Sequence, residues 1–171
     1  MASTQNIKIG ACKVLFNGVD LGHTKGGVTV NYKPDFSDIL ADQWGETPVD
    51  KALLSEEFTV TVPLTESQIS NIKVAIPLGT VGGATNGKMT VGKNAGARLA
   101  AVAGQLILHP LANAATDASN DVVLYKAVVA DEVEIGYNNE DQRILEVTFF
   151  AFVDETKADG SWLGHMGDST N

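Results

Sequence analysis

Apolar and polar residues alternate in two runs near the start of the chain, at residues 28–33 and 58–64. In both runs every second side chain is apolar, which predicts two half-buried β-strands. The segment that joins them, residues 34–57, is long and polar and has little strand pattern. Connections of more than about 15 residues without structure of their own are uncommon in compact domains and usually serve a function. We therefore expect residues 34–57 to form a functional loop.

Another strand hairpin is predicted near the end of the chain. Residues 122–129 lead into an alternating run at 133–137, and the polar cluster at 138–142 has the composition of a turn. Residues 145–153 then return with an apolar side chain at every second position. The strand pattern ends there.

The polar face of this last hairpin is acidic. If residues 138–142 form the turn, Glu132, Glu134 and Glu146 lie together on the face opposite the apolar side chains. Like charges that face one another destabilise a pair of strands, so this face must be well hydrated. The pattern alone fits the solvent side of a folded domain.

Shorter strand signals occur at three further places. Residues 12–16 read as a strand, and the turn residues Asn17 and Gly18 predict that the chain reverses after it. A short strand is indicated at residues 88–91, inside a loop-like stretch rich in Gly, Thr, Asn and Lys. The strand pattern resumes within residues 98–111.

One helix is predicted directly after the second alternating run. Thr65 as N-cap and Gln68 at the third helical position match a capping box, and Leu64 with Ile69 matches a hydrophobic staple. Pro77 ends the helix. Seven or eight short strands, one helix and no βαβ rhythm predict a mainly β domain, an antiparallel β-sandwich or half-barrel with one flanking α-helix.

The domain is expected to span residues 1–153, and residues 154–171 form a polar C-terminal arm. Two apolar spots lie outside the predicted strands: Trp44 within residues 34–57, and Trp162-Leu163 in the C-terminal arm. Trp44 either anchors a partner or folds the loop over its own core. Trp162-Leu163 is an apolar pair among glycines and acids, which is typical of a contact with another surface.

Composition narrows the functional classes. The chain has 171 residues and a formal net charge of −9, which is unfavourable for binding nucleic acid through its phosphates. Cys12 is the single cysteine, so neither an intrachain disulfide nor a thiolate metal cluster is expected. The N-terminus lacks a signal-peptide pattern, and no apolar run approaches the roughly 20 residues of a membrane span.

Motifs that would indicate catalysis or a cofactor are incomplete. Two Gly-x₄-Gly-Lys stretches end in Met89 and Asn94, where a phosphate-binding loop needs Ser or Thr. Residues 117–121 begin like a calcium loop but lack its glycine and distal glutamate. The three histidines, His23, His109 and His165, lack zinc spacing, and Cys12 has no activating neighbour in the sequence. The sequence predicts neither an enzyme nor a cofactor.

Four segments suggest a family. Residues 21–34 read Leu-Gly-His-Thr-Lys-Gly-Gly-Val-Thr-Val-Asn-Tyr-Lys-Pro, residues 42–51 read Asp-Gln-Trp-Gly-Glu-Thr-Pro-Val-Asp-Lys, and residues 58–66 read Phe-Thr-Val-Thr-Val-Pro-Leu-Thr-Glu. A strand ending Leu-Ile-Leu-His-Pro-Leu follows at residues 106–111. Together with the final hairpin they resemble the major tail tube protein of long-tailed bacteriophages with non-contractile tails, over residues 17–153.

The resemblance implies a β-sandwich with a flanking helix whose copies form hexameric rings, and rings that stack into a tube. The tube is the conduit through which the genome leaves, and DNA passes its lumen without specific binding. Implied partners are the tail tip or initiator, tape-measure and terminator proteins, and the implied location is the virion tail, assembled in the host cytoplasm. Tubes of contractile tails and of type VI secretion share this fold and are an alternative.

The resemblance also implies that residues 34–57 and 154–171 reach neighbouring subunits. Candidate contact residues between subunits are Trp44, Pro48, Val49, Trp162 and Leu163, and candidate lumen charges are Glu132, Glu134 and Glu146. A competing interpretation is a monomeric carbohydrate-binding or adhesin-like sandwich, in which Trp44 and Trp162 would be sugar platforms.

Overall fold

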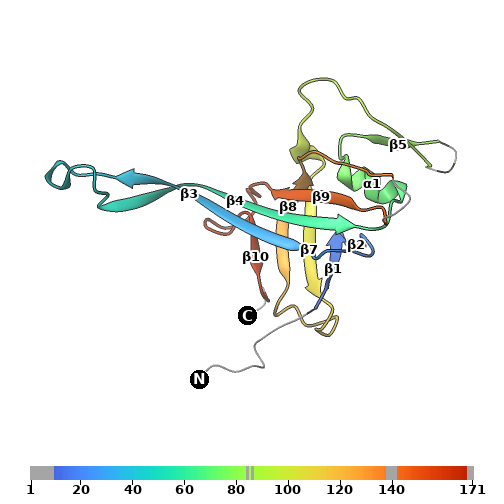
Figure 1. Ribbon diagram of the computed structural model, residues 1–171, viewed down its shortest axis with the longest axis horizontal. Helices are drawn as coiled ribbons and strands as arrows, with labels where there is room; N and C mark the ends of the chain where they lie inside the picture. Colours follow the sequence, from blue (N-terminus) through green and yellow to red (C-terminus); the bar gives the residue numbers. More distant parts are fainter. Residues whose placement is uncertain (1–9, 84, 86, 138–141, 169–171) are drawn as a thin grey trace.

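The computed structural model describes residues 10–83, 85, 87–137 and 142–168. The chain is mainly β, with 43% of residues in strands and 8% in helices, and its sheets are antiparallel (Figure 1). The strands are β1 (Cys12–Phe16), β2 (Val19–Asp20), β3 (Thr29–Ile39), β4 (Asp50–Leu64), β5 (Thr80–Gly82), β6 (Lys88–Thr90), β7 (Gly104–Pro110), β8 (Val122–Val129), β9 (Leu145–Ala151) and β10 (Gly164–Met166). Within the described residues the α-helix is α1 (Ile69–Ala75), and the 3₁₀ turns are η2 (Asp42–Trp44) and η3 (Leu99–Ala101).

One large sheet contains most of the strands, in the order β2-β1-β7-β8-β9-β4-β3, and β5 pairs with β6 separately. In Figure 1 the strands β1, β7, β8 and β10 run across the direction of β9, β4 and β3. The apolar core contains side chains from both groups of strands. Its buried members are Val14, Leu21, Phe58, Val60, Val62, Leu64, Ala75, Leu106, Leu108, Leu124, Ala127, Val129, Leu145, Val147 and Phe149.

Several sequence predictions are confirmed. β1 and β2 form the N-terminal hairpin, and Asn17 and Gly18 adopt positive φ angles of 51° and 77°, as a tight hairpin turn requires. In β9 the side chains of Leu145, Val147 and Phe149 are buried at every second position, as the alternation predicts. The short strand predicted at residues 88–91 is β6.

The predicted capping box is wrong, although the helix itself is present and ends before Pro77. α1 begins at Ile69 with Gln68 as its N-cap, and no side chain caps it. The Thr65 hydroxyl instead donates a hydrogen bond of 3.0 Å to the backbone oxygen of His23. Thr65 therefore links the connection between β4 and α1 to the connection between β2 and β3, and it is not part of the helix.

The predicted strand at residues 133–137 is also wrong. Only a single bridge, from Ile135 to Leu145, occurs in this run. β8 pairs directly with β9, with Val129 opposite Phe149. Most of the predicted turn, residues 138–141, lies outside the described residues. The acidic run at 131–134 thus follows a strand without being one.

Two segments expected to lack strands contain them. The predicted loop over residues 34–57 is wrong, because β3 and β4 pair from Thr29 opposite Thr61 to Ile39 opposite Asp50. Within the predicted C-terminal arm, β10 pairs with the first half of β8. β10 lies on the edge of β8 that β9 leaves free there, since β9 pairs only with the second half of β8.

Candidate interaction surface

A two-stranded arm projects from the body of the protein. We define the arm as residues 33–57, the part of the β3–β4 hairpin outside the body. β9 pairs with β4 only from Thr59 to Leu64, so within the arm β3 and β4 pair only with each other. Figure 1 shows the arm extending far beyond the other strands. An isolated two-stranded ribbon is at best marginally stable in water, so the arm is suited to contact another surface.

One face of the arm continues the apolar core outward. Val60 is buried opposite Val30, and the next pair on that face is Tyr32 and Phe58. Farther out Phe36 lies opposite Leu53. We call Tyr32, at the base of the arm, together with Phe36 and Leu53 within it, the stripe. Each of these side chains is about half exposed, at 51%, 48% and 51%.

A β-bulge keeps the stripe on one face. The register shifts between Asp35 opposite Ser55 and Phe36 opposite Leu53, so Leu54 is an extra residue in β4. If the strands paired regularly, Leu54 would lie opposite Phe36. Leu53 would then point to the polar face, because successive side chains of a strand alternate between its two faces. The bulge explains why sequence alternation missed both strands here.

The other positions of the arm are mostly charged or small, apart from the exposed side chains of Ile39, Leu40 and Leu54. The opposite face carries pairs such as Lys33 with Glu57 and Ser37 with Ala52. The stripe ends at an ion pair, in which the Lys51 Nζ lies 2.6 Å from the Asp38 Oδ1. Exposed ion pairs of this kind contribute little to stability, but this one joins facing residues of the ladder and favours their register.

The tip of the arm exposes further apolar side chains. Trp44 lies in η2 and is 69% exposed, so it does not fold the segment over the core. Val49 donates its backbone N–H to the oxygen of Ile39 at 2.9 Å, which closes the tip. Pro48 precedes it and is exposed. Three of the predicted contact residues, Trp44, Pro48 and Val49, therefore lie together at the tip.

The other two predicted contact residues lie at the base of the arm. Leu163 packs against the core of its own chain, and its backbone oxygen accepts a hydrogen bond of 3.1 Å from the Tyr125 N–H. Trp162 remains 37% exposed. It lines a hollow of about 250 Å³ between residues 160–166 and the start of the arm.

A hydrogen bond spans the base of the arm within this hollow. The Tyr32 hydroxyl donates to the Glu56 Oε1 at 2.5 Å. Because this bond favours the protonated phenol, the neighbouring carboxylate raises the pKa of Tyr32 above its usual value. The phenol therefore stays neutral and bridges the two strands where they leave the body.

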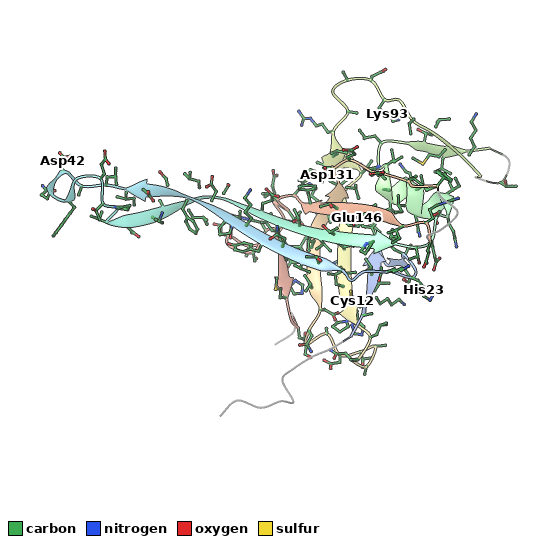
Figure 2. The ribbon with its side chains drawn as sticks, viewed as in Figure 1. Cys12, His23, Asp42, Lys93, Asp131 and Glu146 are labelled. Carbon is green, nitrogen blue, oxygen red and sulfur yellow. The ribbon has the colours of Figure 1, made fainter. Side chains whose placement is uncertain are left out.

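The three candidate lumen glutamates border one open hollow of about 590 Å³. Glu132 and Glu134 come from the segment after β8, and Glu146 comes from β9 (Figure 2 labels Glu146 and the adjacent Asp131). Asp131 and Thr148 complete its polar lining. The sequence placed these glutamates on one face of a hairpin, and the structure brings them together around a hollow instead.

The remaining candidate groups are not arranged as a reactive site. Cys12 is a free thiol in β1, and burial raises its pKa, which makes it a weak nucleophile at neutral pH. Among the described residues no group of three or more His, Cys, Asp or Glu is arranged to hold a metal ion. The three histidines are separated, with ring Nδ1 partners at Glu66 for His23, Asp121 for His109 and Tyr125 for His165.

Phe36 and Leu53 are the stripe residues that sequence reasoning missed. The adjacent leucines at 53 and 54 are the available signal, since two neighbouring apolar residues on a ribbon with one apolar face indicate a bulge.

No helix in the part of the chain that the structure describes is long and apolar enough to cross a membrane. In comparisons with known proteins, neither a family model nor a curated sequence matches the chain.

Proposed function

We propose that this protein is a self-assembling structural protein, the tail tube protein of a bacteriophage with a long non-contractile tail. In this proposal its copies form hexameric rings that stack into the conduit for the genome. The observation that carries the proposal is the arm, which presents apolar residues along one face and at its tip. Among the described residues, the chain leaves Phe36 and Leu53 on that face about half exposed.

Burial energy supports association through the arm. Fully burying a large apolar side chain stabilises by about 1.5–3 kcal/mol, so a half-exposed one gains about half of that when a partner covers it. Tyr32, Phe36, Leu53 and Trp44 together are thus able to supply several kcal/mol. A second copy is the natural partner, because a long exposed ribbon on a monomer is otherwise an aggregation hazard.

The free sheet edges support closure into rings. In the monomer β2 and β3 are the end strands of the large sheet. If neighbouring copies in a ring pair these two edges with each other, no free edge remains. Closed barrels and cyclic oligomers remove their free edges in the same way. The long outer edge of β3 would then be covered by the next subunit.

In this proposal the hollow bordered by Glu132, Glu134 and Glu146 faces the lumen. Carboxylates repel phosphates, so DNA slides past without specific binding. Replacing all three with Lys should allow folding and ring stacking but slow genome passage in a salt-dependent way. Normal infectivity of particles with this triple substitution would reject the lumen role.

Negative-stain electron microscopy of the purified protein at increasing concentration tests the proposal. We expect tubes of stacked rings, and we expect Trp44→Ala to form them more slowly while melting at the temperature of the wild type. A wild-type protein that stays monomeric at all concentrations and binds glycans would contradict the proposal and favour a carbohydrate-binding module.

A further inference from the structure

The charges of this chain are segregated between two segments. The arm, residues 33–57, contains seven acidic and two basic residues, a net formal charge of −5. Residues 69–103, which include α1, β5, β6 and η3, contain four basic residues and no acidic one. We call residues 69–103 the lobe. A chain with a net charge of −9 therefore carries one segment of net charge +4.

Three cations of the lobe are available to a partner. Lys88, Lys93 and Arg98 are exposed, and none forms an ion pair with a described residue. Lys73 is different, because its Nζ donates to the backbone oxygens of Pro77 at 2.6 Å and Gly79 at 2.7 Å. Its charge adds to the field of the lobe while its donors stabilise the end of α1.

The acidic tip of the arm has matching free groups. Asp42 and Glu46 are exposed in the turn that joins β3 to β4. Asp38 is already paired with Lys51. The tip therefore offers carboxylates beside the apolar side chain of Trp44.

The two charged segments lie at opposite ends of the molecule. Figure 2 places Asp42 at the far end of the arm and Lys93 on the other side of the body. They cannot meet within one chain, but the arm of one copy can reach the lobe of another. Such a head-to-tail contact leaves an arm and a lobe free on the resulting pair, so it continues until a ring closes or a filament grows.

The lobe also offers a place for an apolar side chain. A hollow of about 280 Å³ lies beside Lys73 and is lined by Phe16, Val74, Pro77 and Val102, among others. Aromatic residues that enter such pockets carry much of the energy of protein contacts. Trp44 is the most exposed aromatic side chain of the arm.

We propose that the acidic arm of one copy docks on the basic lobe of the next copy, with Trp44 buried against the hollow between α1 and η3. This inference rests on the proposed function, since it names the surface that receives the arm during assembly. Electrostatic complementarity sets the direction and register of the contact, and the apolar tip supplies its affinity.

Paired charge reversals test the contact. The lobe variant carries Lys93→Glu and Arg98→Glu, and the arm variant carries Asp42→Lys and Glu46→Lys. All four positions are exposed, so both variants should fold and melt like the wild type. Each variant alone brings like charges together at the contact, and we expect the concentration needed for assembly to rise about tenfold or more.

Mixing the two variants is the matched control. In an equimolar mixture the substituted residues of each variant meet residues of opposite charge on the other variant, so assembly should return with the two chains alternating. Wild-type assembly should also weaken when the salt rises from about 50 mM to about 500 mM, because salt screens exposed charges. Assembly would be followed by sedimentation and electron microscopy.

The outcomes separate this inference from the proposed function. If wild-type tubes form and both variants assemble as readily, the contact is wrong while the tube remains. If the variants assemble only when mixed but yield open chains instead of tubes, the contact is right and the tube is wrong. A mixture that fails to associate, or a wild type that stays monomeric at low salt, would overturn the contact.

Discussion

Phe36 and Leu53 face one another across the arm because Leu54 is bulged out of β4 between them and the body. The bulge places both side chains on the face that continues from the buried Val60 and its partly buried partner Val30. A single extra residue thus extends the apolar face of the core beyond the core itself. The stripe side chains are about half exposed, so about half of their burial is still to be gained on association.

Replacing Phe36 and Leu53 with Ser should therefore impair assembly while leaving the chain folded. We expect the free energy of unfolding in urea to fall by about 1–3 kcal/mol in total, because about half of each side chain is already covered within the chain. The fraction of protein that sediments as tubes should fall sharply. Ala52→Ser on the opposite face is the control and should assemble normally. Equal assembly of the double variant and this control would remove the stripe from the interface.

Leu163 and Trp162 should differ in what they stabilise. Leu163 packs against the core, so Leu163→Ala should lower the free energy of unfolding by about 1–2 kcal/mol. Trp162→Ala should cost less, because the ring is 37% exposed and lines an open hollow. Chemical denaturation of both variants checks this difference. A larger loss for Trp162→Ala would mean that the hollow, not the core, holds the C-terminal segment.

Gly164 is required by the close approach of β10 to β8. A Cβ at this position would overlap the backbone oxygen of Val123, which cannot move without breaking the ladder. Gly164→Ala should therefore detach β10 and leave residues 164–166 unprotected in amide exchange. Gly82→Ala is the matched control, since open space surrounds its Cβ position. Retained protection of β10 in Gly164→Ala would show that the strands pack less tightly there.

The contact between His23 and Glu66 should depend on pH. The two side chains lie 2.8 Å apart, and this contact raises the pKa of His23 and lowers that of Glu66. The contribution of His23 to the free energy of unfolding is fully present below its ordinary pKa of 6.5. It is lost as the pH rises through the raised pKa. The contribution from Glu66 is lost when the pH falls through its lowered pKa.

An NMR titration of the His23 ring in the wild type and in Glu66→Gln measures this coupling. The substitution should lower the pKa of His23, and Glu57→Gln, a remote exposed carboxylate, should leave it unchanged. An identical His23 titration in wild type and Glu66→Gln would mean that the two groups are separated in solution.

The strands that cover the core were predictable from sequence because burial on one face imposes alternation. Val60, Val62 and Leu64 on β4, and Leu145, Val147 and Phe149 on β9, are all buried and all at every second position. Burial constrains which side chain a position tolerates, so it leaves a readable pattern.

The arm and β10 were missed because burial does not shape them. Both faces of the arm are exposed, and the bulge at Leu54 interrupts the count of positions. β10 has three residues and begins with Gly164. The aromatic side chain of Trp44 identified the tip from the sequence. The stripe could be identified only from the pairing register of β3 and β4, which places Phe36 opposite Leu53. The acidic glutamates were grouped correctly by position, but through a strand that does not form.

β4 belongs to the arm and to the body without interruption, and this gives the fold a mechanical property. Force on a docked arm acts along the axis of β4. In the body β4 is held by β9 through the pairs from Thr59 to Leu64 and by β3 through Phe58 to Thr61. The ladder hydrogen bonds lie perpendicular to the strand, so tension loads all of them together in shear and does not peel them off one after another. An assembly joined by such arms transmits a pull through β4 into the β3–β4–β9 part of the sheet of each subunit.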